Sequence, residues 1–133
     1  MKWPGGKRWI AKKLAHDIAA RLSCRYYEPF LGGGAVFFAL RPKEATLSDI
    51  NQDLINVYIQ VRDRPEEIIE GLKRIPVTKE NYYRIRNDTN EDLIKKSIRF
   101  LYLNRTAFGG IYRLKVVNQL CVGIWIYRRI QQS

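Results

Sequence analysis

Two acidic residues and a run of glycines lie close together in the first third of the chain. Glu28 and Pro29 precede the glycine run at residues 32–34, and Asp49 follows seventeen residues after Gly32. Glycine has no Cβ, so a backbone built from it can approach a bound molecule closely. An acid that follows the second strand of a doubly wound α/β sheet accepts hydrogen bonds from a ribose diol. These residues therefore predict a pocket for an adenosine-type ligand.

The residues around the glycines narrow the class of ligand. The dinucleotide pattern G-x-G-x-x-G requires a third glycine where this chain has Phe37, which disfavours a dinucleotide-dependent dehydrogenase, and the Walker pattern is also absent. Glu28 would repel a pyrophosphate but suits a ligand that carries cations, such as the sulfonium and amino groups of S-adenosylmethionine. The alternative is a tight strand-to-helix turn that binds nothing.

The elements that must position these residues follow from hydrophobic periodicity and turn signals. Apolar and β-branched patterns predict strands over 24–28 and 45–48, and helices over 7–22, 34–40, 51–63, 65–75, 79–87 and 91–104. From Gly109 onward β-branched and aromatic residues predict a hairpin or irregular structure. Helix, strand, glycine turn, helix, strand, acid and helix is the start of a doubly wound α/β sheet, of which we count only two strands.

The positive charge is concentrated at the two ends of the chain. The net charge is +11: residues 1–27 hold seven Lys or Arg and one acid, residues 93–133 hold eight and no acid, and the stretch between holds nine basic and twelve acidic residues. This distribution predicts a polyanion such as nucleic acid, held by the terminal segments. The alternative is a generally basic protein with solvated lysines.

Composition favours one globular core. The chain has 133 residues, of which 46% are hydrophobic and 28% charged. It shows no apolar run of the roughly 18 residues that a membrane span needs. We expect no secretory signal, no membrane partner and no metal, and the two cysteines without a C-x-x-C pattern favour a cytoplasmic protein.

Four segments resemble the Dam-type, D12 class DNA adenine-N6 methyltransferases: "KWPGGK" (2–7), "YEPFLGGGAVF" (27–37), "LSDINQDLINVY" (47–58) and "FLYLNRTAFGGIYR" (100–113). They follow the family order, and the resemblance spans residues 1 to about 114. It implies α/β architecture: a Rossmann-like, S-adenosylmethionine-dependent methyltransferase fold with an incomplete sheet in residues 1–62, and a helical DNA target-recognition region in 63–133. The enzymes of this family flip an adenine out of double-stranded DNA and methylate its N6.

The resemblance also implies roles for individual residues. Those matching the family's cofactor segments are Trp3, Lys7, Glu28, Pro29, Phe30, Gly32, Gly34, Asp49, Ile50 and Asn51. Those matching its DNA-contacting segment are Asn104, Arg105, Gly110, Tyr112 and Arg113. An indole offers a flat face to a base or a cation, and arginine pairs with phosphate or guanine.

Plainer structural roles stay open for several of these residues. Trp3 could be an ordinary core aromatic and Lys7 a solvated lysine at a helix start. Asp49 could cap the helix that begins near Asn51. Asn104, with its neighbour, could cap the end of its own helix.

The chain departs from the family pattern in one respect that concerns catalysis. The family's catalytic block is an Asp-Pro-Pro-Tyr type tetrapeptide, but none of the five prolines here is followed by another, so we assign no catalytic residue. The pattern also changes near Lys115, which suggests a truncated or frameshifted reading of a longer gene; translation of the other frames from codon 115 tests this. We expect weak or no methyl transfer by residues 1–133 alone, and the alternative is a non-catalytic DNA- or cofactor-binding remnant.

Overall fold

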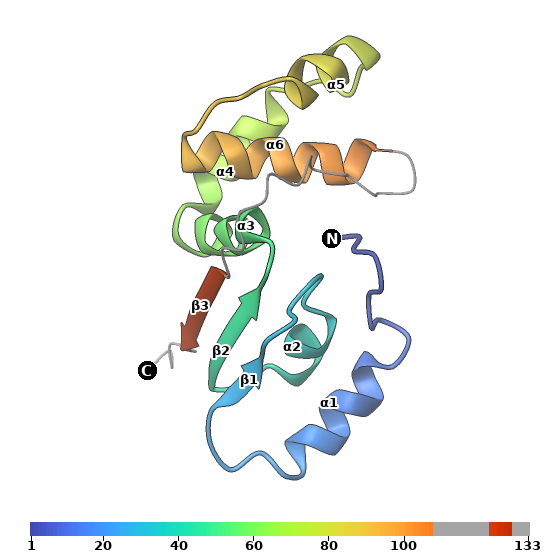
Figure 1. Ribbon diagram of the computed structural model, residues 1–133, viewed down its shortest axis with the longest axis vertical. Helices are drawn as coiled ribbons and strands as arrows, with labels where there is room; N and C mark the ends of the chain where they lie inside the picture. Colours follow the sequence, from blue (N-terminus) through green and yellow to red (C-terminus); the bar gives the residue numbers. More distant parts are fainter. Residues whose placement is uncertain (108–122, 129–133) are drawn as a thin grey trace.

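The computed structural model describes residues 1–107 and 123–128. Along these residues the elements are α1 (Ala11–Ala19), β1 (Tyr26–Glu28), α2 (Ala35–Leu40), β2 (Glu44–Asp49), α3 (Gln52–Asp63), α4 (Pro65–Lys73), α5 (Lys79–Arg86), α6 (Leu93–Thr106) and β3 (Gly123–Arg128). The sheet, α1 and α2 lie at one end, α4, α5 and α6 at the other, and α3 lies between them (Figure 1). The protein is therefore mixed α/β.

The sheet contains three strands among the described residues, in the order β1-β2-β3. β1 and β2 are parallel, with Glu28 opposite Leu47, whereas β2 and β3 are antiparallel, with Asp49 opposite Gly123. The expectation of only two strands was therefore wrong. The run GIWIYR is rich in β-branched and aromatic residues that favour a strand, and it pairs with the free edge of β2. The other residues after Gly109 that were predicted as hairpin or irregular lie outside the described part.

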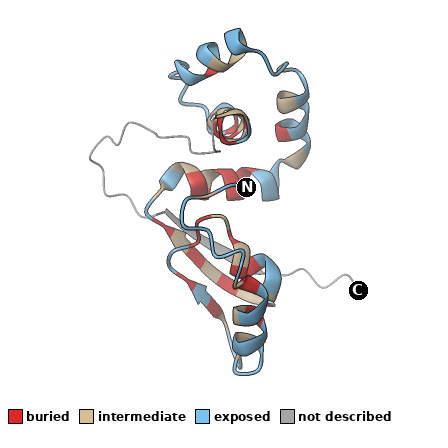
Figure 2. Ribbon diagram, turned by 90° about the vertical axis from the view of Figure 1, so that its right-hand side faces the viewer, coloured by how far each residue is buried: buried red, intermediate tan, exposed pale blue. Residues whose placement is uncertain are grey.

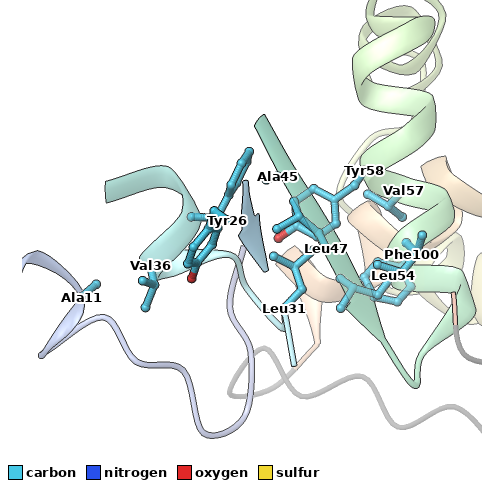
Figure 3. Packing of buried hydrophobic residues seen from close by; sticks show 12 residues of the cluster. Ala11, Tyr26, Leu31, Val36, Ala45, Leu47, Leu54, Val57, Tyr58 and Phe100 are labelled. Carbon is cyan, nitrogen blue, oxygen red and sulfur yellow. The ribbon is translucent and has the colours of Figure 1, made fainter. Parts of the chain in front are cut away.

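The main core lies where α1, α2, α3 and α6 meet the strands. Figure 3 shows its side chains converging from these elements, and Figure 2 shows buried residues concentrated on α3, α6 and the sheet. Leu47 of β2 and Leu54 of α3 are fully buried within it. The members of this cluster are Ala11, Tyr26, Leu31, Val36, Phe37, Ala45, Leu47, Leu54, Ile55, Val57, Tyr58 and Phe100. Burial of this apolar surface is the main force that holds the strand ends in place.

A second, smaller cluster holds the helical end together. Ile85 of α5 packs with Tyr102 and Leu103 of α6, against the partly buried Leu72, Ile75 and Tyr82. Because α6 also supplies Phe100 to the main core, this one helix belongs to both clusters. The helical end is therefore attached to the sheet end through α6.

Most predicted boundaries agree with the structure to within two residues, but α1 is shorter than predicted at both ends. Residues 7–10 and 20–22 lie outside it. The position before its first turn, Ile10, provides no side-chain cap, so the helix has no strong start signal. The helices α3, α5 and α6, by contrast, begin at side-chain caps from Asn51, Thr78 and Asp92.

In residues 1–107 and 123–128 no helix has the length and apolarity needed to cross a membrane. The same residues bring together no group of three or more His, Cys, Asp or Glu side chains that could hold a metal ion.

Candidate functional site

Glu28 and Asp49 are the last residues of β1 and β2, and both carboxylates point to the buried face of the sheet. Side chains alternate along a strand, so Asp49 shares the face of Ala45 and Leu47, and Glu28 shares the face of Tyr26. Because β1 and β2 are parallel, their carboxyl ends lie at the same edge of the sheet. The fold thus brings together two acids that are twenty-one residues apart in the sequence.

Asp49 joins the glycine loop to the start of α3. One carboxylate oxygen, Oδ2, accepts from the backbone N–H of Gly32 at 2.8 Å, and the other, Oδ1, accepts from that of Asn51 at 2.9 Å. The side chain of Asn51 in turn accepts from the N–H of Leu54 at 3.0 Å and caps α3. The idea that Asp49 itself caps this helix was therefore wrong, since Asn51 is the cap and Asp49 orients it.

The loop at residues 31–34 is fixed by hydrogen bonds on several sides. The N–H of Leu31 donates to the carbonyl of Ser48 at 3.0 Å, and the N–H of Gly34 donates to the carbonyl of Leu31 at 2.9 Å. The hydroxyl of Tyr58, on α3, donates to the carbonyl of Gly32 at 3.0 Å. Both the N–H and the carbonyl of Gly32 are thus held by side chains, which leaves the loop preorganised.

Two of the glycines are required by backbone conformation and by neighbouring rings. Gly32 has φ +51°, and a Cβ there would lie 2.8 Å from Cδ1 of Trp3. Gly34 has φ +68°, and a Cβ there would lie 2.8 Å from Cε2 of Phe38. Only glycine adopts such φ values without strain and leaves space for these rings. The glycines therefore have a packing reason in addition to the predicted approach to a ligand.

The N-terminal residues fold back over the loop through a tight turn. The N–H of Gly6 donates to the carbonyl of Trp3 at 3.1 Å, with Pro4 and Gly5 between them and Gly5 at φ +70°, as in a type II turn. The indole of Trp3 stacks on Phe100 of α6, with ring centroids 6.2 Å apart and planes 22° apart. Trp3 thus lies between α6 and the glycine loop.

A cavity of about 480 Å³ lies between this N-terminal segment and the glycine loop. Its volume is in the range of small-molecule sites, about 300–1,000 Å³. Five of the residues expected at the cofactor line it: Trp3, Lys7, Phe30, Gly32 and Asp49. The remaining lining residues are Met1, Lys2, Pro4, Gly5, Gly6, Arg8, Leu31, Gly33 and Ala35. The cavity therefore combines basic side chains, apolar surface, open backbone and one acid.

Glu28 lies behind the cavity rather than in its lining. Its carboxylate accepts from the hydroxyl of Tyr26 at 3.0 Å and faces Nζ of Lys7, a lining residue, at 3.9 Å. Burial raises the pKa of Glu28 above its ordinary value, although the Tyr26 hydroxyl, the Lys7 ammonium and the backbone of Phe37 each act to lower it. The negative charge of the buried carboxylate is thus only partly compensated, and a further cation nearby would stabilise it.

The other expected cofactor residues lie around the cavity without lining it. Gly34 is the N-cap residue that precedes α2, Asn51 caps α3, and Pro29 accepts through its carbonyl from the Ser48 hydroxyl at 3.2 Å. Ile50 is 63% exposed, and the lining residue Phe30 is 77% exposed. Both present apolar surface to solvent beside the strand ends.

Of the five residues expected to contact DNA, two lie in the described part of the chain. Asn104 is buried, and its side chain bonds the backbone of Lys2, whereas Arg105 is exposed on α6. Gly110, Tyr112 and Arg113 lie outside the described residues.

The sequence did not indicate a role in the site for Tyr58, which donates a hydrogen bond to Gly32, or for Phe100, on which Trp3 stacks. Tyr58 lies in the helix face predicted over 51–63, but only the fold shows that its hydroxyl reaches the glycine loop.

Substitution of Gly32 by alanine is expected to cost more stability than the same change at Gly5. Both have positive φ, which costs an L-residue about 1–2 kcal/mol. Only at Gly32 does the new Cβ meet Trp3, which adds about 1–3 kcal/mol of overpacking, whereas at Gly5 it meets nothing within 4 Å. Urea unfolding of Gly32→Ala, Gly5→Ala and Trp3→Ala/Gly32→Ala measures this. Equal costs at the two glycines, or no relief from Trp3→Ala, would contradict the packing shown here.

The Glu28→Gln variant is expected to gain stability over the wild type as pH rises. The pKa of Glu28 in the folded state is raised above its ordinary 4.5, so the folded protein binds the proton of this carboxyl more tightly than the unfolded chain does. The stability that this bound proton contributes is fully present below about pH 4.5 and is lost as pH rises through the folded-state pKa. A neutral amide does not titrate, so the difference in free energy of unfolding should widen in favour of the variant as pH rises from about 4.5 through the folded pKa of Glu28. Urea unfolding across this range measures the difference; a pH-independent difference would refute the assignment.

Comparison of the sequence with known proteins identifies its family. The sequence profile of the D12 class N6 adenine-specific DNA methyltransferases matches residues 3–132. The type II methyltransferase M1.LlaDCHI of Lactococcus lactis subsp. cremoris is 36% identical over 135 residues, which cover 96% of this chain and 47% of the relative. M.MjaIII of Methanocaldococcus jannaschii is 34% identical over 150 residues, covering 96% and 52%. The DNA adenine methylase of Escherichia coli is 33% identical over 138 residues, covering 97% and 48%.

The chain thus spans about half the length of the curated relatives that it matches. The profile match covers nearly all of its residues, including the glycine loop and both acids. The chain therefore belongs to the D12 class N6 adenine-specific DNA methyltransferase family.

Proposed function

We propose that this chain is the cofactor-binding portion of an S-adenosylmethionine-dependent methyltransferase that modifies N6 of adenine in double-stranded DNA. The observation that carries the proposal is the cavity at the carboxyl ends of β1 and β2, with Asp49 in its lining beside the glycine loop. Ligands of open α/β sheets bind at this edge. The family to which the chain belongs supplies the reaction class.

The Asp49 carboxylate is positioned to accept hydrogen bonds from the ribose of the cofactor. An ionised carboxylate offers about four lone-pair positions, and one backbone N–H on each oxygen leaves positions for the two ribose hydroxyls. The same two hydrogen bonds fix the carboxylate before any ligand arrives, which lowers the entropy cost of binding. The exposed side chains of Phe30 and Ile50 offer apolar surface to the adenine ring.

Glu28 supplies negative charge for the methionine end of the cofactor. Its carboxylate is buried, and its nearest ammonium, Lys7, lies at 3.9 Å, which is longer than a hydrogen-bonded ion pair. The amino group of S-adenosylmethionine would supply the further cation, and the methyl group on its sulfonium is the group that the enzyme would transfer, leaving S-adenosylhomocysteine. Trp3 and Lys7 contribute a flat face and a positive charge from the N-terminal segment that lines the cavity. These roles, like those of Pro29, Gly32, Gly34 and Asn51, are proposals drawn from family position.

We also propose that residues 1–62 hold the cofactor and that residues 63–133, apart from β3, which pairs with β2 in the sheet, face DNA. The second hydrophobic cluster, which is drawn from residues 63–133 alone, supports this division, and Arg105 is exposed on α6, the helix that belongs to both clusters. Phosphate contacts from Arg105 and Arg113 would fix the register of the duplex. Gly110 and Tyr112 are proposed to lie at the same interface. A DNA substrate is consistent with a cytoplasmic location.

A second candidate is a binding remnant without catalysis. It is favoured by the absence from this sequence of any Pro-Pro pair, and hence of the family's catalytic tetrapeptide. We propose that residues 1–133 alone transfer methyl groups weakly or not at all, while the cofactor cavity still binds.

Titration calorimetry with S-adenosylmethionine tests the proposal. The wild type is expected to bind, and Asp49→Asn to bind at least about tenfold more weakly, because an amide accepts through only one oxygen and leaves one buried N–H unpaired. Asp17→Asn, an exposed acid on α1, is the matched control and should not change affinity.

Two readouts decide between the candidates. Transfer of a radiolabelled methyl group to unmethylated DNA above background would support the enzyme and contradict the remnant. Absence of S-adenosylmethionine binding by the folded wild type, or unchanged affinity in Asp49→Asn, would contradict the proposed cofactor site itself.

A further inference from the structure

The N-terminal strap, defined as residues 1–8, forms one wall of the cavity. Every residue of this segment lines it. The strap belongs to no helix or strand and contributes nothing to the sheet, so it must be held in place by contacts with other elements. The described contacts connect it chiefly to α6, the helix that joins the two clusters.

Asn104 is the side chain that holds the strap's backbone. Its Oδ1 accepts from the N–H of Lys2 at 3.2 Å, and its Nδ2 donates to the carbonyl of Lys2 at 2.8 Å. A primary amide both accepts and donates in this way, whereas a carboxylate only accepts. Asn104 is buried and lies one turn of α6 beyond Phe100, which stacks on Trp3. Two adjacent strap residues thus meet two residues on one face of α6.

The position of Trp3 depends on this attachment. A Cβ on Gly32 would touch Cδ1 of Trp3 at 2.8 Å, and a Cβ on Gly33 would lie 3.3 Å from Cβ of Trp3. The indole therefore packs directly against the loop that Asp49 and Tyr58 hold by hydrogen bonds to Gly32. If Lys2 is released, Trp3 loses the backbone attachment next to it and keeps only its packing on Phe100 and the loop, so this wall of the cavity is held less firmly.

We propose that Asn104 is a positioning residue: by holding the strap it keeps the wall of the cofactor cavity in place. Asn104 is not a contact to DNA. The inference rests on the proposed function, since it assumes that S-adenosylmethionine occupies the cavity. It reassigns Asn104, which family position placed at the DNA interface, to the cofactor side of α6. The exposed neighbour Arg105 keeps its place on the DNA side.

The test compares Asn104→Asp with two controls in the full chain. The carboxylate keeps the volume of the amide and the acceptor for the N–H of Lys2, but it places an oxygen against the Lys2 carbonyl. Arg105→Gln changes the next residue on the exposed face. Ile85→Val removes one methyl from the second cluster, away from the cavity, and controls for a general loss of stability.

Hydrogen exchange of the N-terminal peptide and calorimetry with S-adenosylmethionine are the readouts. Asn104→Asp is expected to exchange faster in residues 1–8 and to raise the dissociation constant about tenfold, with retained helical circular dichroism. Arg105→Gln and Ile85→Val should leave both unchanged. Asn104→Ala serves as a second variant if the aspartate fails to fold.

The outcomes separate the two proposals. Unchanged exchange or unchanged affinity in the folded Asn104 variants, with normal wild-type binding, overturns the role of Asn104 alone. Equal weakening by Ile85→Val also overturns it, because a general loss of stability then explains the effect. A folded wild type that binds no S-adenosylmethionine overturns the proposed function and the cofactor role together.

Discussion

The arrangement of the site depends on one carboxylate with two backbone partners. Asp49 ends β2, and its two oxygens accept from Gly32 and Asn51, so a strand end, a loop and a helix start meet at a single side chain. The side chain is buried, and buried acceptors that lose a partner cost about 1–3 kcal/mol. The loop therefore has one stable position relative to the sheet, and the cavity beside it has a defined wall.

The other wall of the cavity is formed by the strap, residues 1–8, which is neither helix nor strand. The strap is held by Asn104 and by the stacking of Trp3 on Phe100, both on α6. α6 also packs in the second cluster through Leu103. The helix that carries the exposed Arg105 thus also supports the cavity, so the proposed cofactor support and the proposed DNA contact lie on different faces of one helix.

Much of the sheet end could be predicted from the sequence because its signals are local. The glycine run, the acid after each strand and the periodicity of α3 all lie within short windows, and the structure places Glu28 and Asp49 at one edge as expected. β3 was not anticipated as a third strand because its pairing with β2 joins residues about eighty positions apart. A strand partner at such a separation has no local signature.

The details of the site were less predictable for the same reason. The sequence showed that Asn51 and Asp49 lie near a helix start, but not which of them caps it, since an offset of two residues decides this. Nor did it show that the glycines face Trp3 and Phe38, or that Tyr58 reaches Gly32. Family position matched Asn104 to a DNA-contacting segment but carries no information on which face of α6 a residue occupies, and the bonds of Asn104 to the Lys2 backbone are visible only in the fold.

The most direct measurement is a crystal structure of the chain with S-adenosylhomocysteine, the demethylated cofactor. The expected result is a nucleoside in the cavity beneath Trp3, with both ribose hydroxyls within about 3 Å of the Asp49 carboxylate while Gly32 and Asn51 keep their hydrogen bonds to it. A nucleoside bound elsewhere, or one whose ribose makes no contact with Asp49, would contradict the assignment of this cavity.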